Sequence, residues 1–358
     1  MKIGLVSYYS RNYGALLQGY ALQEILKEFG HEVIAINRGW MEYGNLVWNF
    51  NYSFSDRIKK ALVNFPFDDF VRNEINMSMP IASLDDLKRV STKLDVIISG
   101  SDQIWNADTI HYMDYYFFLD WVNGNTRKLS YAASFGRDTF EVSREKKQMV
   151  GKLLAEYEAL SVRESSGVDI CQNEFGLFAT QHLDPTLLLT KEKYLSLLKP
   201  GGQSKHPYFC TYVLDSSMEV EKVIAEVIQK SNLERIDNFA QPTRFLNQLK
   251  HKKERMPTVY QWLSNIANSK FVVTDSFHGT VFSIIFHKSF VCVNNKERGS
   301  ARFESLLKSV GLEERLVDLE NDSSEKITKL LNQDIDYVEL DKKLEALRND
   351  SLEFLRSI

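Results

Sequence analysis

Short apolar runs that end in a polar turn and lead into a segment with helical spacing recur along this chain. An early example is Ile3 to Tyr8, which precedes a polar loop and then apolar residues at helical spacing from Leu16 to Leu26. A late example is Phe271 to Val273, followed by the polar turn Thr274 to Gly279 and the apolar run Thr280 to His287. Alternating strands and helices predict parallel sheets that are covered by helices. The chain is therefore predicted to be an α/β protein.

The length of the chain predicts two domains, because 358 residues exceed what one hydrophobic core usually supports. The best linker is the polar, turn-forming segment from Lys199 to Pro207, after which the α/β pattern starts again. We expect an N-terminal Rossmann-like domain at 1–198, with an insertion at about 40–80, and a C-terminal Rossmann-like domain at 199–333. Residues 334–358 are predicted to form a helical segment that packs back on the N-terminal domain.

Several cofactor and partner classes are not favoured. The loop from Tyr9 to Asn12 lacks the G-x-G-x-x-G pattern of a dinucleotide site. The net charge of -4 gives no bulk attraction for nucleic acid, so an anionic ligand has to be held by a local group of basic side chains and helix starts. Cys171, Cys210 and Cys292 show no C-x-x-C spacing, which predicts neither a zinc site nor disulfides. We expect no metal and no other cofactor.

The N-terminus and the distribution of apolar residues predict a cytoplasmic protein. Met1 to Val6 has the pattern of a strand and is too short for the apolar region of a signal peptide. No apolar run has the length that is needed to span a bilayer. We expect at most a peripheral association with a membrane, where a lipid-linked substrate would be reached. The sequence does not indicate an oligomeric state.

Four turns carry dense polar side chains directly after a predicted strand. In doubly wound sheets the carboxyl ends of the strands line one edge, so these distant turns are expected to converge. Each turn alone has a structural explanation, such as a helix N-cap for Asp102 or a surface ion pair for Arg163. The four turns are Arg11 to Gly14, Ser101 to Asn106, Arg163 to Ser165, and Asp275 to Gly279.

The ordered set of these segments resembles the polysaccharide pyruvyl transferases. The resemblance runs from about residue 1 to residue 312, and its order is more specific than any single motif. The resembling segments are Asn12 to Ala15 with Gln18 and Tyr20 to Gln23, Gly100 to Asn106, Ser130 to Gly136, Ser161 to Glu164, Leu183 to Leu187, Asp275 to Gly279, and the basic loop around Lys296.

The resemblance implies a GT-B-like glycosyltransferase architecture with two Rossmann-like domains facing a cleft. It implies phosphoenolpyruvate as the donor and co-substrate, and a sugar with two hydroxyls as the acceptor. The product would be a cyclic pyruvate ketal on a surface polysaccharide, such as an exopolysaccharide or capsule, or on its precursor. An arginine and a histidine of the family are associated with donor binding and catalysis, and the matching residues are Arg163 and His278. We expect these two side chains to face one another across the gap between the domains.

Family members often carry Arg or Leu where this chain has Phe277, so Arg298 or Arg302 is expected to supply the charge instead. Ketal formation needs a proton on the methylene carbon of the donor, which makes His278 the candidate general acid. Guanidinium groups bind carboxylate and phosphate with two prongs, and Arg163 is the first candidate. The other expected donor contacts are Ser276, Phe277, Gly279, Lys296, Arg298 and Arg302.

The attacking hydroxyl of the acceptor needs a base, and Asp102 is the candidate. Asp275 is its rival, although Asp275 is favoured as the N-cap of the following helix. Trp105 is expected to stack on a sugar ring, whereas Phe117 to Leu119 are expected in the core. A turn-stabilising role is equally open for Asn12 and Asn106. The candidate acceptor-binding residues are Asn12, Tyr13, Gln18, Gln103, Trp105 and Asn106.

Two other functions stay open at this point. A nucleotide-sugar glycosyltransferase would use the same architecture for a diphosphate donor, because a fold does not fix a function. The third reading is a non-catalytic carbohydrate-binding protein. The sequence does not name the acceptor sugar, the positions and stereochemistry of the ketal, or whether the acceptor is lipid-linked, nucleotide-linked or polymeric.

Overall fold

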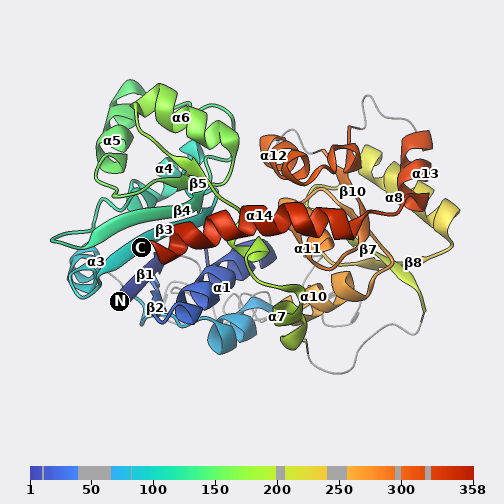
Figure 1. Cartoon of the computed structure of the whole chain (residues 1–358), viewed down its shortest axis with the longest axis horizontal. Helices are drawn as coiled ribbons and strands as arrows, with labels where there is room; N and C mark the ends of the chain where they lie inside the picture. Colours follow the sequence, from blue (N-terminus) through green and yellow to red (C-terminus); the bar gives the residue numbers. More distant parts are fainter. Residues whose placement is uncertain are drawn as a thin grey trace, which may run out of the picture. The chain divides into compact units, whose positions relative to one another are not determined.

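The computed structural model describes eight segments of the chain, and these fold into two compact α/β units (Figure 1). The first unit is Met1–Leu188 together with Leu347–Ile358, and the second is Leu189–Ala346. Most of the predicted linker and of the predicted insertion lies outside the described residues, although residues 66–74 are helical. The described segments are residues 1–9, 12–38, 66–81, 83–198, 206–239, 256–294, 300–318 and 324–358.

The first unit is built on a six-stranded parallel sheet in the order β2-β1-β3-β4-β5-β6. Because all strands run the same way, their carboxyl ends share one edge, which is where the polar turns lie. The strands are β1 (Lys2–Val6), β2 (Glu32–Ala35), β3 (Val96–Asp102), β4 (Arg127–Ala133), β5 (Ser161–Val162) and β6 (Thr180–Gln181). The helices are α1 (Tyr13–Glu28), α3 (Leu84–Ser91), α4 (Ala107–Met113), α5 (Arg144–Leu154) and α6 (Ser165–Phe175), with 3₁₀ turns at Tyr116–Phe118 and Pro185–Leu187.

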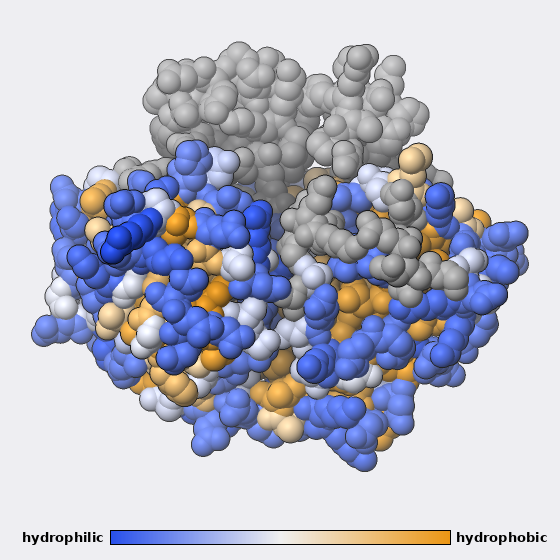
Figure 2. All heavy atoms as spheres, turned by 90° about the horizontal axis from the view of Figure 1, so that it is seen from above, coloured by the Kyte–Doolittle hydropathy of each residue, from blue (hydrophilic) through white to orange (hydrophobic). Residues whose placement is uncertain are grey.

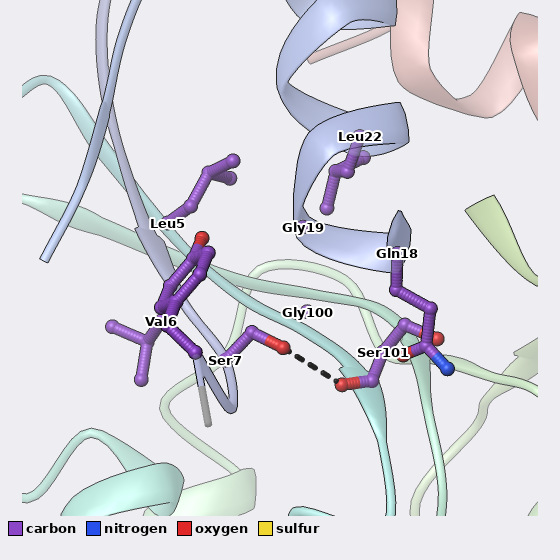
Figure 3. A pocket seen from close by; sticks show the side chains of 9 residues that line it. Leu5, Val6, Ser7, Gln18, Gly19, Leu22, Gly100 and Ser101 are labelled. Carbon is purple, nitrogen blue, oxygen red and sulfur yellow. Dashed lines mark hydrogen bonds between the residues drawn. The ribbon is translucent and has the colours of Figure 1, made fainter. Parts of the chain in front are cut away.

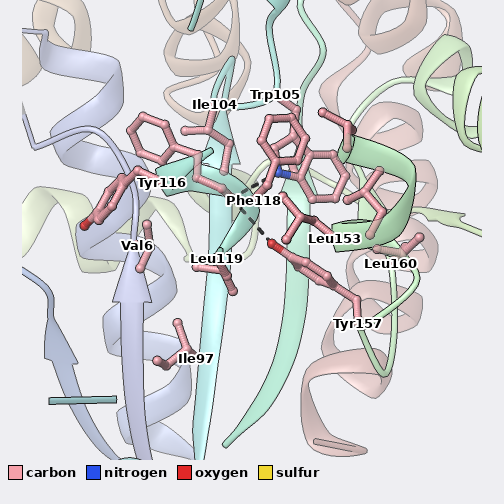
Figure 4. Packing of buried hydrophobic residues seen from close by; sticks show 14 of the residues in the cluster. Val6, Ile97, Ile104, Trp105, Tyr116, Phe118, Leu119, Leu153, Tyr157 and Leu160 are labelled. Carbon is pink, nitrogen blue, oxygen red and sulfur yellow. Dashed lines mark hydrogen bonds between the residues drawn. The ribbon is translucent and has the colours of Figure 1, made fainter. Parts of the chain in front are cut away.

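An aromatic cluster fills one face of this sheet (Figure 4). Phe117, Phe118 and Leu119 are at most 1% exposed, which confirms their predicted place in the core. The carbonyl of Phe117 accepts hydrogen bonds from Ser99 Oγ (2.7 Å), Trp105 Nε1 (3.3 Å) and Tyr157 Oη (3.4 Å). A single backbone oxygen thereby satisfies three buried donors, as buried polar groups require.

The second unit contains a five-stranded parallel sheet in the order β11-β10-β9-β7-β8. Two parallel-sheet α/β units confirm the predicted fold class. The strands are β7 (Tyr208–Tyr212), β8 (Glu234–Asp237), β9 (Phe271–Thr274), β10 (Ser289–Val293) and β11 (Leu316–Val317). The helices are α7 (Lys191–Ser196), α8 (Met218–Ser231), α10 (Val259–Asn268), α11 (Phe277–Ile285), α12 (Ala301–Val310), α13 (Ser324–Asn332) and α14 (Tyr337–Arg356), with a 3₁₀ turn at Glu313–Arg315.

The last helix, α14, begins in the second unit and ends in the first. At its start, Tyr337 Oη donates a hydrogen bond to the carbonyl of Lys288 (2.6 Å) within the second unit. Towards its end, Arg348 Nε donates to the carbonyl of Leu187 (2.9 Å), and Ser351 Oγ accepts from the amide of Leu183 (3.1 Å). The last residues of the chain are therefore packed on the N-terminal unit.

Figure 2 shows a face of the molecule that is mostly hydrophilic, with apolar residues exposed in scattered patches. Within the described part of the chain, every helix is too short or too polar to cross a bilayer.

A buried cation, Arg315, ties three elements of the second unit together. Its side chain is 0% exposed, and its Nη1 donates to Ser289 Oγ (3.0 Å) and to the carbonyls of Phe290 (3.3 Å) and Leu330 (2.9 Å). Its Nη2 donates to the carbonyl of Gln333 (2.6 Å). Burial lowers the pKa of Arg315. The guanidinium thus joins the start of β10 to the end of α13, where helix carbonyls lack partners of their own.

We expect Arg315→Met to reduce the free energy of unfolding by about 3 kcal/mol or more, because several buried carbonyl groups lose their donor. The measurement is urea unfolding followed by circular dichroism. The control is Arg89→Met, which removes a largely exposed ion pair with Asp86 and should leave the free energy of unfolding nearly unchanged. Equal effects of the two substitutions would contradict the role given to Arg315.

Candidate functional site

Two polar turns meet at the carboxyl ends of β3 and β4 in the first unit. The carbonyl of Asp102 accepts a hydrogen bond from the amide of Ser134 (3.0 Å), and the amide of Trp105 donates to the carbonyl of Ser134 (3.1 Å). Asp102 itself has a φ of 81°, a backbone conformation that few residues other than glycine adopt. Its Oδ1 accepts a hydrogen bond from the amide of Gln103 (2.8 Å). The predicted base is thus held in a strained turn, as is common at functional sites.

Gly136 brings two predicted acceptor-binding amides together. It has a φ of 76°, and a Cβ at this position would lie 2.9 Å from both Gln103 Oε1 and Asn106 Nδ2. The Gln103 and Asn106 side chains therefore both pack against the bare backbone of Gly136. Asn106 also has the turn-stabilising role that was left open, because its Oδ1 accepts from the amide of Asp108 (2.9 Å) at the start of α4. Asn12 caps α1 in the same way through the amide of Ala15 (3.1 Å).

The predicted aromatic contacts of the acceptor lie deeper than expected. Trp105 is 0% exposed and stacks on Phe118 with ring centroids 5.8 Å apart, which is the packing of a core residue and not of a sugar-stacking surface. Tyr13 is 1% exposed and packs against Phe67, with ring centroids 4.9 Å apart. The residues around Trp105 in the sequence did not indicate that it is buried. An indole ring can pack in a core or stack on a sugar ring, and the sequence does not distinguish these two roles.

Gln18 lies at a small cavity of about 10 Å³ between α1 and the ends of β1 and β3 (Figure 3). Its side chain extends from α1 to the vicinity of Ser101, and Ser7 Oγ donates to the carbonyl of Ser101 (3.1 Å). Gln18 is 1% exposed. The cavity is lined by Leu5, Val6, Ser7, Tyr9, Gln18, Gly19, Leu22, Gly100 and Ser101.

Arg163 follows β5 at the same sheet edge and is 5% exposed. Its Nε donates to Glu164 Oε1 (2.7 Å), and its Nη1 donates to Asp184 Oδ2 (3.1 Å). Burial alone would lower the pKa of Arg163, but the carboxylates of Glu164 and Asp184 raise it above its usual range. The guanidinium is therefore charged and fixed by two acids, which sequence reasoning did not assign to the site.

Tyr8 is another residue of this edge that sequence reasoning missed. Its hydroxyl lies 3.3 Å from Thr109 Oγ1, which in turn donates to the carbonyl of Gln103 (3.3 Å). Burial raises the pKa of Tyr8. The only sequence signal was its place as the last residue of the first apolar run.

The second unit places His278 in the first turn of α11, at the carboxyl end of β9. The imidazole is 7% exposed and packs edge-on against Phe277, with ring centroids 5.2 Å apart. The N-cap is Ser276, so the prediction that Asp275 caps this helix is wrong. Asp275 instead accepts hydrogen bonds from the amides of Leu214 (2.7 Å) and Asp215 (2.9 Å), which fixes the loop after β7.

Gly279 allows α11 to begin directly against β9. A Cβ at this position would lie 2.1 Å from Thr274 Oγ1, closer than any real contact. The same hydroxyl donates to the carbonyl of Tyr212 (2.6 Å) and accepts from the amide of Ser276 (3.0 Å), so it has no room to move. This close approach sets the position of Ser276 and His278 relative to the sheet.

Arg302, at the start of α12, lies close to Phe277. Its Cζ is 5.9 Å from the centroid of the Phe277 ring and 5.9 Å from that of Phe303, and the residue is 8% exposed. A guanidinium is thus present beside the position where the resembling family often carries an arginine. The other two predicted basic residues, Lys296 and Arg298, lie outside the described residues. Among the described residues, no group of three or more His, Cys, Asp or Glu side chains is arranged to hold a metal ion.

The family model for polysaccharide pyruvyl transferase matches residues 12–297 of the chain. This protein belongs to the polysaccharide pyruvyl transferase family. The match includes the edge of the first unit and the start of α11, and it ends just before Arg302. No curated protein gives a significant match to the chain.

Solved structures similar to this one share its fold at low sequence identity. One is a UDP-GlcNAc 2-epimerase from Neisseria meningitidis bound to UDP-GlcNAc, with a TM-score of 0.54, 9% identity and coverage of 99% of this chain and 98% of the other. Another is the S. aureus MnaA–UDP co-structure, with a TM-score of 0.50, 11% identity and coverage of 96% and 90%. This pyruvyl transferase family member therefore shares the fold of these two solved structures.

We expect Gly279→Ala to reduce the free energy of unfolding by about 3 kcal/mol, because the added methyl group overlaps an immobile hydroxyl. Thermal and urea unfolding measure the loss. Gly151→Ala is the matched helical control, since its methyl group would meet only the Phe175 side chain, at 3.2 Å, and should change stability by less than about 1 kcal/mol. A fully stable Gly279→Ala protein would show that the close approach of α11 to β9 is not required.

Proposed function

We propose that this protein transfers the pyruvyl group of phosphoenolpyruvate to two hydroxyls of a sugar, forming a cyclic ketal and releasing phosphate. The sugar belongs to a surface polysaccharide or its precursor. The proposal rests on membership of the pyruvyl transferase family. The observation that carries it is the buried imidazole of His278 at a helix start, with the Arg302 guanidinium beside the adjacent Phe277 ring. A helix start and a guanidinium both favour an anion.

The residues divide the chemistry in the following way. His278 gives a proton to the methylene carbon, and the first sugar hydroxyl bonds to the adjacent carbon while Asp102 accepts the hydroxyl proton. Phosphate then leaves with the electron pair of its C–O bond and takes the proton held by Asp102. The second hydroxyl bonds to the same carbon and closes the ketal, and its proton returns to His278. Arg302 and Arg163 hold the carboxylate and phosphate of the donor, because guanidinium groups match both oxyanions.

The acceptor is assigned to the carboxyl edge of the first sheet. Gln103 and Asn106 offer amide groups at Gly136, and Gln18 and Ser101 line the neighbouring cavity. These neutral donors and acceptors suit sugar hydroxyls better than they suit an anion. Asp102 lies in the same turn as Gln103, where an acid can act on a hydroxyl held by its neighbours.

We expect His278→Ala to lower kcat by about 10²- to 10⁴-fold without loss of fold, because a general acid contributes that much. Phosphate release from phosphoenolpyruvate is measured with a panel of p-nitrophenyl hexosides as acceptors. The matched control is His287→Ala, which removes a part-exposed histidine paired with Asp341 and should leave kcat unchanged. Wild-type protein that releases nucleotide from UDP-sugars, and no phosphate from phosphoenolpyruvate, would contradict the proposed function.

We expect Arg302→Leu to raise the KM for phosphoenolpyruvate by about ten- to a hundredfold, the effect of losing one charged hydrogen bond. The KM for the acceptor should not change. Adding Phe277→Arg to this variant returns a guanidinium to the same place and should recover part of the loss. Lys308→Leu, on the exposed part of α12, serves as the control. An unchanged donor KM in Arg302→Leu would remove this arginine from the donor site.

A further inference from the structure

We infer that Asp184 is a positioning residue that orients the Arg163 guanidinium for the donor. This inference rests on the proposed function. The two residues are 21 positions apart in sequence, and Asp184 follows β6 while Arg163 follows β5. Asp184 Oδ2 accepts from Arg163 Nη1 (3.1 Å), and the side chains are 1% and 3% exposed. Glu164 holds the opposite side of the fork at Nε (2.7 Å).

Asp184 is itself fixed by contacts on both of its oxygens. Its Oδ1 accepts from the amide (3.0 Å) and the hydroxyl (2.5 Å) of Thr186, and its Oδ2 accepts from Ser101 Oγ (3.3 Å) as well as from Arg163. Ser101 is tied in turn to Ser7 Oγ through its carbonyl (3.1 Å). The Asp184 carboxylate is therefore held in one orientation. Its hydrogen bond to Nη1 in turn fixes the orientation of the Arg163 guanidinium.

The backbone of Arg163 is fixed as well, so the carboxylates decide only where the fork points. Its amide donates to the carbonyl of Ala133 (3.1 Å), and its carbonyl accepts from Gln181 Nε2 (3.1 Å). With the main chain anchored on both sides, the long side chain keeps its rotamer freedom unless its end is held. Contacts at two different nitrogens remove that freedom in advance, which lowers the entropy cost of binding an oxyanion.

The composition of this group favours a positioning role over a stabilising one. Glu164 and Asp184 place two carboxylates on one guanidinium, with all three residues at most 5% exposed. Burying ions costs free energy that their attraction often fails to recover, so well-packed apolar residues would stabilise the unit at least as well. A buried charged group at the ligand-binding edge of a parallel sheet is instead typical of a functional site.

The test is Asp184→Asn. An asparagine can still accept from Thr186 through its side-chain oxygen. Its amide N–H₂ then faces Arg163, so the Arg163 Nη1 group loses its acceptor. We expect the KM for phosphoenolpyruvate to rise at least tenfold, with the acceptor KM unchanged and kcat at saturating donor lowered less than threefold.

A double-mutant cycle separates positioning from a general effect on the fold. If Asp184 acts through Arg163, then Asp184→Asn adds nothing to the donor KM of Arg163→Lys, which has already lost the fork. Ser289→Ala is the structural control, because it removes one acceptor from the buried Arg315 and should leave the donor KM unchanged. Multiplicative effects of Asp184→Asn and Arg163→Lys, or an unchanged donor KM in Asp184→Asn, would overturn the inference.

A second measurement does not depend on turnover. In protein labelled with ¹⁵N-arginine, the Arg163 Nη hydrogens are identified by their loss in Arg163→Lys, and their hydrogen exchange should be at least tenfold faster in Asp184→Asn than in the wild type, because Asp184 holds Nη1. Slow exchange in both proteins would show that Asp184 does not hold the guanidinium. Faster exchange in Asp184→Asn than in the wild type, combined with no phosphate release from phosphoenolpyruvate by the wild type, would support the positioning while rejecting the proposed substrate.

Discussion

The parallel hydrogen-bond ladder is the constraint on which the rest of this structure depends. Because every strand of a sheet runs in the same direction, residues that follow different strands are delivered to the same edge. In the first unit this brings Ser101, Arg163 and Asp184 into one buried group, although Ser101 and Asp184 are separated by more than eighty residues. As a consequence, several polar side chains are buried from water at this edge. The hydrogen bonds among them stabilise the edge, because buried polar groups need partners.

The fold class follows from the sequence because each strand and helix carries its own local pattern. The cap at Asn12 and the core residues Phe117 to Leu119 are local in the same sense, since a neighbour in sequence decides them. Trp105 and Asp275 were assigned wrongly for the opposite reason. Their positions are set by Phe118 across a turn and by the amides of Leu214 and Asp215 on another strand end. Sequence spacing contains no information about those partners.

In the candidate site, too, the sequence identified some residues and missed those whose role depends on distant partners. Arg163 and His278 were selected because they lie in polar turns directly after apolar strands and match the arginine and histidine positions of the resembling family. The residues that hold them in place were not marked. Glu164 and Asp184 fix Arg163 through single atoms, and Gly279 fixes the start of α11 through the space that it leaves empty. Glycine and acidic residues are common in turns. Only the three-dimensional structure shows which of them hold a functional side chain in place.

The two units hold their charged groups in different ways, and this difference bears on what each one does. Arg163 is compensated by carboxylates, so the group around it carries no excess of positive charge. Arg302 lies against the rings of Phe277 and Phe303, with its Cζ 5.9 Å from each ring centroid. A guanidinium between two carboxylates contributes mainly direction to an approaching anion, because its charge is already balanced. In the function proposed above, alignment of the donor is therefore the role assigned to Arg163.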